Sequence, residues 1–430
     1  MNQNPFTFGN PIRESDRFIG RERAIQQIVS RLLSSAHEST SVVGERRIGK
    51  TSLLKHLANP DIAQEYGLNK DKFCLVYIDF QGLTDITPLR FWQRVLRLMG
   101  RSIRNENLLY EIETIRKKDE IDLFDLEDLF YLISDEGVNI ILLMDEFEFV
   151  TQNTNFGSDF FGGLRALAIH CNLSLIPSTR CELVDLCHSE EIKGSPFFNI
   201  FATVVLRPFT HQQAKDLLQR YSTGTEFPFS IEEISFIINL VGGYPIFTQI
   251  GGYYLYDGKL QGLESDQLLE YVIDSFREQA DQHFKYYWSH STESEKITLL
   301  AAMAIRNSDS KKNKPIKDRI KELHSRASLD INELVKRGLI VEIDNEVRVF
   351  SPVFEQWISL EVSAVPGEDE NASSVEEWLK EGGNEKLNPV KGALPKFKKK
   401  YWGPVGNVIK EVSFGIIEKI TVEMIVGTIR

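Results

Sequence analysis

The stretch GERRIGKTS, residues 44–52, restricts the possible folds of this 430-residue chain more than any other feature. It fits the pattern Gly-x-x-x-x-Gly-Lys-Ser/Thr, with the apolar run Ser41–Val43 before it and an expected helix, Lys50–Leu57, after it. Glycines in such a turn let backbone N–H groups point inward around phosphate groups, and the N-terminus of the following helix faces their negative charge. The stretch therefore predicts a nucleotide-phosphate site in a strand–loop–helix unit.

Each residue of this loop has an expected role in holding a nucleotide. The ammonium group of Lys50 is expected to reach the terminal phosphates, and the hydroxyl group of Thr51 to bind Mg²⁺. The predicted nucleotide contacts are Gly44, Glu45, Arg46, Arg47, Ile48, Gly49, Lys50, Thr51 and Ser52. For the arginine pair we expect solvent exposure or a structural ion pair first; contact with phosphate or with a neighbouring domain is the alternative.

A second motif, IILLMDEFE, places acidic residues directly after a run of apolar residues. The run predicts a buried strand, Ile140–Asp145, and open α/β sheets bind ligands at the carboxyl ends of such strands. We expect Asp145 to orient the Mg²⁺ shell and Glu146 to polarise the attacking water as a general base. An acidic loop without a catalytic role is the alternative. Together the two motifs predict binding of ATP or GTP.

A third candidate contact follows the predicted strand Leu173–Pro177. The sequence continues with Ser178, Thr179 and Arg180, and we expect this strand to lie beside the Asp145 strand and to direct these polar groups at the γ-phosphate. A guanidinium group suits that role because it can bind a phosphate through two parallel hydrogen bonds. The alternative is an exposed arginine that simply follows a strand.

A fourth candidate is the turn Gly242–Pro245, with the sequence GGYP. Two consecutive glycines end a helix, and the flat apolar ring of Pro245 offers a surface on which adenine could pack. Most turns of this composition are only turns, so an ordinary connection between two helices is the alternative.

Strand-type and helix-type segments alternate from about residue 18 to residue 210. The expected strands are Ser41–Gly44, Cys74–Asp79, Ile140–Asp145, Leu173–Pro177 and Thr203–Leu206. The expected helices are Glu22–Ser34, Lys50–Leu57, Leu89–Gly100, Leu123–Asp135 and Phe160–His170. This alternation predicts an α/β domain with a parallel sheet and helices on both of its faces.

After Pro208 the sequence becomes mainly helical. Thr210 and Ser230 are expected N-caps, and residues 339–343 and 347–350 are expected to form a hairpin that follows two helices, as in a winged helix. The predicted organisation is a P-loop nucleotide-binding domain at 1–209, a helical lid at 210–285, a winged helix at 286–362, a linker at 363–377 and a short C-terminal region at 378–430.

The composition of the chain limits which partners and which cellular location we expect for it. The formal net charge of −12 argues against attraction of the whole surface to nucleic acid or anionic lipid. Neither a signal peptide nor an apolar run of roughly 18 residues is visible, so we expect a cytoplasmic protein. The four cysteines lack the spacing of a zinc site and are expected to be reduced thiols.

These motifs together resemble the STAND class of AAA+ P-loop ATPases, the signal-transducing proteins that include plant and animal immune receptors. The likeness covers about residues 5–360 and includes FIGRERAI, Phe18–Ile25, in which the resemblance assigns Arg21 to the adenine. It also assigns Arg180 as the sensor arginine and Gly243–Pro245 as the lid motif. GERRIGKTSLL is particularly similar to bacterial members.

The resemblance implies ATP or ADP with Mg²⁺ as ligands and slow hydrolysis. It further implies a closed ADP-bound resting state and an ATP-bound state that self-associates, in bacterial defence or stress signalling. Such proteins usually carry a repeat array as sensor and a separate effector domain, whereas this chain leaves only residues 378–430 for either role. A protein that acts as trigger or effector partner is therefore expected but not identified.

Two questions stay open from the sequence. Residues 378–430 combine basic and aromatic residues with an apolar stripe; packing on the protein's own core or on a partner is the first expectation, and a membrane surface is the alternative. The alternative function is a DNA-associated, origin-recognition-like ATPase that uses the winged helix. Nucleic acid is the less expected partner, because Glu342, Asp344 and Glu346 place negative charge in the hairpin.

Overall fold

The computed structural model describes residues 3–12, 14, 17–306, 316–322, 326–343 and 346–363. They form two compact units. Residues Pro11–Leu206 form one unit, here called the α/β unit, and the residues up to Asn10 join those from Arg207 onward in the other, here called the helical unit. The predicted linker after Ser363 and the C-terminal region 378–430 lie outside the described residues.

The α/β unit is built on a five-stranded sheet in the order β2-β3-β4-β1-β5. All of the strand pairs are parallel, as predicted. The strands are β1 (Thr40–Val43), β2 (Phe73–Asp79), β3 (Asn139–Asp145), β4 (Leu173–Thr179) and β5 (Ala202–Val205). Because β4 lies between β1 and β3, the loop after β1 and the acidic turn after β3 flank the end of β4.

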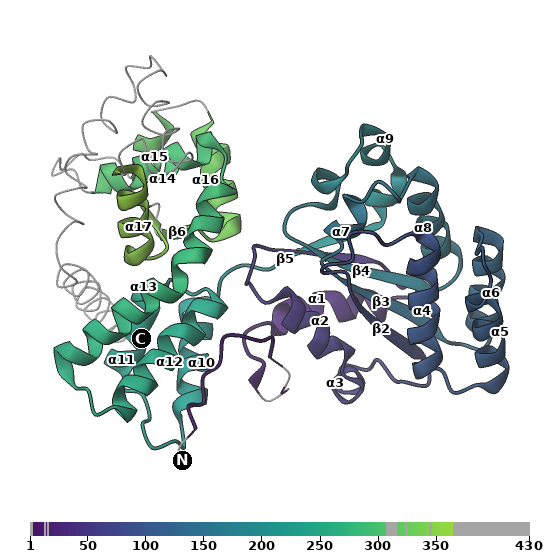
Figure 1. Ribbon diagram of the computed structural model, residues 1–430, viewed down its shortest axis with the longest axis horizontal. Coiled ribbons are helices and arrows are strands. Elements are labelled where there is room, and N and C mark those ends of the chain that lie inside the picture. Colours follow the sequence, from purple (N-terminus) through teal and green to yellow (C-terminus); the bar gives the residue numbers. More distant parts are fainter. Residues whose placement is uncertain are drawn as a thin grey trace. The chain divides into compact units, whose positions relative to one another are not determined.

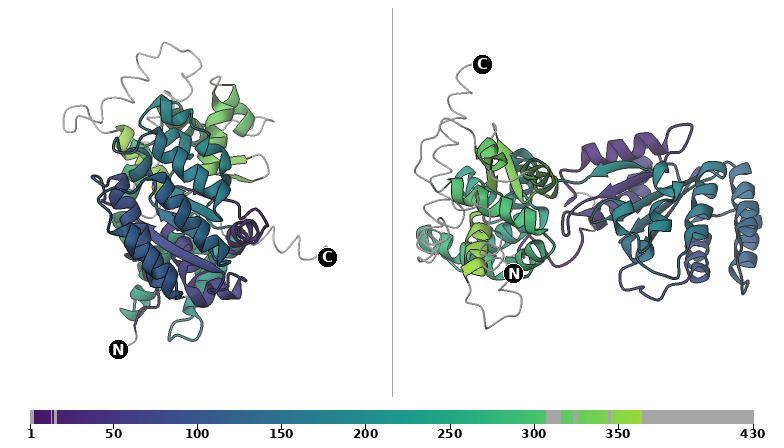
Figure 2. Two further views of the ribbon diagram at one scale, coloured as in Figure 1. Left: turned by 90° about the vertical axis from the view of Figure 1, so that its right-hand side faces the viewer. Right: turned by 90° about the horizontal axis from the view of Figure 1, so that it is seen from above.

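Helices cover both faces of this sheet (Figures 1 and 2). In Figure 2 the purple helix α1 and the blue-to-teal helices α4 and α8 lie on opposite sides of the strands. The expected helices are present as α1 (Glu22–Leu32), α2 (Lys50–Ala58), α4 (Pro88–Ser102), α6 (Leu123–Asp135) and α8 (Ser158–His170). The unit also contains elements that were not expected, namely α3 (Pro60–Glu65), α5 (Glu106–Arg116), α7 (Glu148–Thr151), α9 (Glu190–Lys193) and the 3-10 helices η2 (Leu183–Leu186) and η3 (Pro196–Ile200).

An aromatic cluster anchors the acidic turn after β3. Phe147 lies within that turn and is fully buried, with its ring centroid 6.1 Å from that of Phe80. Phe80 in turn stacks on Phe91 of α4 at 5.5 Å. Burying a phenylalanine contributes about 2–3 kcal/mol, so this packing fixes the backbone from which the neighbouring acidic side chains extend.

The helical unit begins with four helices in the region predicted as a lid. They are α10 (His211–Ser222), α11 (Ile231–Val241), α12 (Pro245–Leu260) and α13 (Ser265–Ser289). Both predicted N-caps are confirmed, because Thr210 and Ser230 each form a complete capping box. Helix α13 continues without a break across the predicted boundary between residues 285 and 286.

The second part of the helical unit contains helices and a hairpin. These elements are α14 (Glu293–Arg306), α15 (Ile316–Lys321), α16 (Ala327–Arg337), β6 (Ile340–Ile343), β7 (Glu346–Val349) and α17 (Pro352–Ser363). The strands β6 and β7 pair antiparallel, with Ile340 opposite Val349. Three helices precede this hairpin, whereas the sequence predicted two, and the winged-helix assignment stays a prediction.

The Gly242–Pro245 turn is packed too closely for larger residues. A Cβ atom on Gly242 would lie 2.2 Å from the carbonyl oxygen of Phe350, and one on Gly243 would lie 2.6 Å from that of Phe209. The backbone N–H of Phe209 also donates a 2.8 Å hydrogen bond to the carbonyl of Gly243. The turn therefore joins the end of α11 to the chain after β7 and to the segment that begins the helical unit.

Tyr244 extends this junction to α16. Its side chain is fully buried, and its hydroxyl group donates a hydrogen bond to the carbonyl oxygen of Arg337, the last residue of α16. Gly338, which follows, has a φ of +81° and lies so close to Pro208 that a Cβ atom would be 2.1 Å from its ring. The lid helices and the hairpin region are thus connected through one packed turn.

The N-terminal segment belongs to the helical unit, although the sequence assigned it to the nucleotide-binding domain. Phe6 is fully buried and its ring stacks on Phe229 at 5.3 Å and packs against Tyr221 at 5.5 Å. Gly252 in α12 leaves room for this ring, because a Cβ atom there would lie 2.5 Å from Cε1 of Phe6. The ring of Phe6 thus fills a slot formed by Tyr221, Phe229 and Gly252. This packing is the physical reason why the N-terminal segment belongs to the helical unit and not to the nucleotide-binding domain.

Candidate nucleotide site

The predicted phosphate loop leaves β1 and enters α2 as a tight turn. The N–H of Gly44 donates a 3.1 Å hydrogen bond to the carbonyl of Thr179 on β4. Farther along the loop, Arg47 and Gly49 both have left-handed backbones, with φ of 67° and 103°. The chain therefore folds back on itself before α2, as a loop that surrounds phosphates must.

The lysine of this loop is buried and already oriented. Lys50 is 6% exposed, and its Nζ donates a 2.9 Å hydrogen bond to the carbonyl oxygen of Gly44. Thr51 follows at the first turn of α2 and is half-buried. The hydroxyl oxygen of Ser52 accepts a 3.3 Å hydrogen bond from the N–H of Ile12, so this residue also fastens the start of the α/β unit.

Arg21 lies against the same loop. The residue is 8% exposed, and its guanidinium group donates a 2.7 Å hydrogen bond to the carbonyl of Ile48. Burial lowers the pKa of Arg21 to about 10, because removal from water disfavours the charged form. Its assignment to adenine stays a prediction, whereas its contact with the loop is a finding. Arg46 and Arg47 are both exposed.

The aspartate after β3 is held by two hydroxyl groups. Asp145 is 1% exposed; Oδ1 accepts a 2.5 Å hydrogen bond from Oγ of Ser178, and Oδ2 accepts a 3.0 Å hydrogen bond from the hydroxyl group of Tyr77. Burial and the negative charge of Asp145 raise the pKa of Tyr77, so the tyrosine stays a donor. The carboxylate therefore has a fixed orientation at the edge of the sheet.

The next residues bring two further carboxyl groups to this edge. Glu146 has a left-handed backbone with a φ of 52°, and its N–H donates a long 3.4 Å hydrogen bond to Oγ of Ser178. Glu148 is 7% exposed, and its pKa is raised to about 7 by burial first and by the negative charge of Glu146 second. The positive charge of Lys50 acts in the opposite direction. Glu148 is therefore within electrostatic reach of both Glu146 and Lys50.

The strand β4 lies beside β3, as the sequence predicted. Ser178 differs from its predicted use, because its hydroxyl group bonds to Asp145 instead of being free for a phosphate. Arg180 follows the end of β4 and is exposed, so its side chain is accessible to a ligand. Pro245 begins α12 in the helical unit, and its contact with adenine stays a prediction.

Sequence reasoning missed Tyr77 and Glu148. Tyr77 lies inside a strand, and nothing in its local sequence distinguishes it from a core aromatic residue; the parallel pairing of β2 with β3 brings it to Asp145. Glu148 did have a signal, since it belongs to the motif MDEFE, but the spacing alone did not show that its side chain is buried.

The residues at this edge fit a magnesium ion bound together with a nucleotide. Thr51 and Asp145 would hold it, and oxygen ligands of this kind suit Mg²⁺, which usually takes few protein ligands and completes its shell with phosphates and water. Within the described ranges no group of three or more His, Cys, Asp or Glu side chains could hold a metal ion alone. The fit therefore depends on the nucleotide phosphates.

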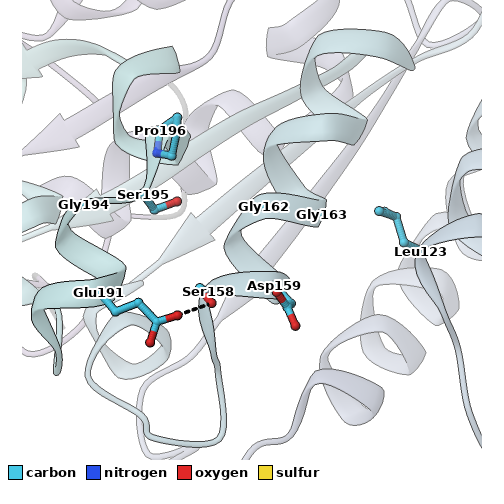
Figure 3. Close-up of a pocket in the computed structure, with 9 residues that line it drawn as sticks. All are labelled: Leu123, Ser158, Asp159, Gly162, Gly163, Glu191, Gly194, Ser195 and Pro196. Carbon is cyan, nitrogen blue, oxygen red and sulfur yellow. Dashed lines mark hydrogen bonds between the residues drawn. The ribbon is translucent and has the colours of Figure 1, made fainter.

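A separate hollow on the α/β unit has a different character. It has a volume of about 630 Å³ and is shown in Figure 3, where Ser158 Oγ donates a 2.7 Å hydrogen bond to Glu191. Its lining residues are Leu123, Ser158, Asp159, Gly162, Gly163, Glu191, Gly194, Ser195 and Pro196. None of the predicted nucleotide contacts is among them, and its charged residues, Asp159 and Glu191, would repel phosphate.

The sequence from residue 24 to residue 310 matches the family described as Novel STAND NTPase 2. The match covers more than half of the 430-residue chain. This chain belongs to the Novel STAND NTPase 2 family. The predicted class is thereby confirmed, and with it a P-loop NTPase that binds nucleotide. No curated protein matches the sequence.

Solved structures confirm the AAA+-type fold of this STAND NTPase. The ORC2 protein of Aeropyrum pernix, solved as ADPNP–ADP complexes, has a TM-score of 0.51 at 12% identity and covers 84% of this chain and 99% of its own. A Walker-type ATPase of Pyrococcus abyssi has a TM-score of 0.53 at 17% identity and covers 81% of this chain and 98% of its own. In the part of the STAND NTPase that the structure describes, no helix has the length and apolarity needed to cross a membrane.

Proposed function

We propose that this STAND NTPase is a nucleotide-gated signalling switch. ADP holds a closed resting state, ATP gives an open state that self-associates, and slow hydrolysis returns the protein to rest. The role proposed for it is bacterial defence or stress signalling in the cytoplasm. Its trigger and effector would be proteins, and residues 378–430, outside the described ranges, would carry the output and could contact a membrane surface.

Binding of ATP with Mg²⁺ is supported by the residues at the edge of the sheet. Lys50 is buried and already points into the loop, and Asp145 is oriented by two hydroxyl donors. Mg²⁺ would neutralise charge on the phosphates. Lys50 would bind the terminal phosphates, and Arg180, exposed at the end of β4, would grip the γ-phosphate.

Hydrolysis needs an activated water at the same edge. Glu146 would accept a proton from that water while the water oxygen forms a bond to the γ-phosphorus. The bond from phosphorus to the bridging oxygen breaks, which leaves ADP and inorganic phosphate. Glu146 is half-buried and has a left-handed backbone, whereas the following Phe147 is fully buried.

The observation that favours a switch over a simple hydrolase is the packed junction at Gly242–Pro245. Pro245, the proposed adenine contact, is adjacent to Tyr244, whose hydroxyl group bonds to the end of α16. A change at Pro245 on nucleotide exchange would therefore be passed to the hairpin region through packed backbone rather than through a flexible loop. The division of this unit into a lid at 210–285 and a winged helix at 286–362 is part of the proposal.

The charges of the hairpin region argue against duplex DNA as the ligand. The Nη1 atom of Arg337 pairs with Glu295 at 3.1 Å, and both side chains are nearly buried. Lys317 pairs with Glu342 of β6 at 2.6 Å. These basic groups are neutralised within the unit, whereas a duplex reader presents free positive charge to phosphates.

The decisive experiment is light-scattering sizing of wild type and Glu146→Gln with ADP and with ATP. The variant keeps ATP because it lacks the base, so we expect it to form the larger species in a greater fraction than wild type. Glu191→Gln, an exposed acid in the Figure 3 hollow, is the matched control and should behave as wild type. A Glu146→Gln protein that stays monomeric in ATP while wild type assembles would contradict the proposal.

The nucleotide that co-purifies with the protein gives a second test. A closed resting state predicts ADP bound to a monomer, released only slowly. If the protein is recovered without nucleotide, and ADP that is added to it dissociates rapidly, the result would argue for an ordinary ATPase instead.

A further inference from the structure

The chain passes between the two compact units twice. One passage lies between Asn10 and Pro11, and the other lies between Leu206 and Arg207. The second passage is expected wherever a nucleotide-binding domain is followed by a lid. The first is not, because it places the start of the chain in the helical unit and the residues that follow in the α/β unit. The segment around this first passage is therefore fastened at both of its ends.

The first anchor of the segment lies on α12, a helix of the proposed lid. Phe6 is fully buried in its slot beside Gly252. Two further contacts reach Tyr253, the next residue of α12. Nδ2 of Asn4 donates a 2.9 Å hydrogen bond to the carbonyl oxygen of Tyr253, and the ring of Phe8 lies edge-to-face with the Tyr253 ring at a centroid distance of 5.2 Å. One helix thus holds the segment by a buried ring, a hydrogen bond and an aromatic contact.

The second anchor lies at the candidate nucleotide site. The N–H of Ile12 donates a 3.3 Å hydrogen bond to Oγ of Ser52, which directly follows Thr51 in the first turn of α2. Farther along the chain, the ring of Phe18 stacks on that of His56, also in α2, at a centroid distance of 4.2 Å. The chain from Ile12 onward is thus fastened to the helix whose N-terminus would face the phosphates.

Only three residues, Gly9, Asn10 and Pro11, separate the two anchors. A Cβ atom on Gly9 would meet nothing within 4 Å, so this part of the segment is not packed. The four residue steps from Phe8 to Ile12 cover at most about 14 Å in a fully extended chain. The contact on α12 and the contact on α2 therefore stay within that distance while both anchors hold. This limit follows from covalent geometry and applies to any arrangement of the two units.

The other passage is short as well. The N–H of Leu206 donates a 2.7 Å hydrogen bond to the carbonyl of Val43 on β1, and the N–H of Phe209 donates a 2.8 Å hydrogen bond to the carbonyl of Gly243 in the helical unit. Two short links between two bodies permit rotation about the line that joins the links, as in a hinge, but oppose separation at either link. One link alone would permit the units to separate in any direction.

We infer that residues 3–12 form a strap that holds the proposed lid to the helix after the phosphate loop, and that this strap slows the release of bound ADP by restricting how far the two units can open. The inference rests on the proposed closed ADP-bound state. The strap adds no contact to the nucleotide. It acts because a second anchored link raises the local concentration of the lid at the nucleotide site, and it is released when Phe6 leaves its slot.

The test lengthens the strap without changing either anchor. Six residues, alternately Gly and Ser, are inserted between Gly9 and Asn10, and the dissociation of ADP with a fluorescent group on its ribose is followed by stopped flow. The free segment grows from three residues to nine, which lowers the local concentration of one anchor at the other by about 5-fold. We therefore expect the insertion variant to release the nucleotide about 5-fold faster than wild type.

The matched control is the same insertion between Asp119 and Glu120, which are both exposed in the connection from α5 to α6. It lengthens the chain equally but touches neither anchor, so its release rate should equal that of wild type. A second variant, Phe6→Ala, removes one anchor and should also release the nucleotide faster. Phe124→Ala is its control, because Phe124 is 73% exposed.

The outcomes distinguish the strap from the proposed switch. Equal release by the Gly9–Asn10 insertion variant and by wild type would overturn the strap, even where wild type retains ADP as proposed. Rapid release by wild type itself would contradict the closed resting state, whereas the ratio between the two proteins still tests the strap. Faster release in Phe6→Ala alone would also overturn the strap, since it would show that the ring only stabilises the helical unit.

Discussion

The Nζ atom of Lys50 lies 2.9 Å from the carbonyl oxygen of Gly44, six residues earlier in the chain, so the lysine closes the phosphate loop on itself. A buried ammonium group must have a partner, and here the loop provides it. Phosphate binding would exchange this neutral acceptor for a charged one, which makes the stronger hydrogen bond. The loop is consequently shaped for a nucleotide before any nucleotide arrives.

Lys50→Ala should strongly weaken nucleotide binding. Loss of a charge-assisted hydrogen bond costs about 2–3 kcal/mol, which corresponds to roughly 30–150-fold in Kd. Isothermal calorimetry with ADP measures this directly, and Lys70→Ala, which removes an exposed lysine of the same unit, should bind as wild type. Unchanged retention of ADP by Lys50→Ala would refute the site.

Tyr77→Phe should lower the affinity of the site for Mg²⁺. The phenylalanine ring still fills the site, but Asp145 loses one of its two hydroxyl donors and keeps only the hydrogen bond from Ser178. Loss of such an orienting partner typically costs 10–100-fold in metal affinity. Magnesium titration of ATP hydrolysis measures the change. The control is Tyr110→Phe, because Tyr110 is 71% exposed. Identical magnesium dependence of both variants would show that Ser178 alone orients Asp145.

Glu148→Gln should be more stable than wild type at high pH and similar to it at low pH. The folded-state pKa of about 7 lies above the usual 4.5, so the folded protein binds the proton more tightly than the unfolded chain. The stability that this gives is present below pH 4.5 and is lost as the pH rises through 7. At 1.36 kcal/mol per pKa unit the loss is ~3 kcal/mol.

Urea unfolding of both proteins at pH 5 and pH 8 measures this difference, and the titrating groups that do not interact with Glu148 cancel between them. The groups that set the effect are Glu146, which raises the pKa of Glu148, and Lys50, which lowers it. An equal stability difference at both pH values would mean that Glu148 has an ordinary pKa in the folded state.

Gly252→Ala should destabilise wild type but stabilise a Phe6→Ala variant. In wild type the added Cβ would meet the Phe6 ring at 2.5 Å and expel it from its slot. Once the ring is absent, only the higher helix propensity of alanine remains, worth about 1 kcal/mol. A double-mutant cycle by urea unfolding measures the reversal of sign. Additive effects would show that Phe6 adjusts without cost.

Much of the α/β fold was predictable because its signals are local. The apolar runs that became β1, β3 and β4 are buried along their whole length, as strands in the interior of a parallel sheet must be. Helices α3 and α5 were not expected. Helix α3 has only six residues, whereas α5 does carry a helical signal that was not used, its buried residues Leu108, Ile112 and Ile115. The capping boxes at Thr210 and Ser230 were predictable because a cap involves only neighbouring residues.

The candidate site likewise has features that depend on local sequence and features that depend on tertiary contacts. The sequence by itself determined the phosphate loop and the aspartate and glutamate after β3, since each depends on a few consecutive residues with one geometry. Only the tertiary structure decided that Tyr77 bonds to Asp145, 68 residues away, that Glu148 is buried, and that Phe6 packs in the helical unit. These are contacts between side chains on separate elements, and their partners are chosen by strand register and by packing of the whole core, which no short stretch of sequence encodes.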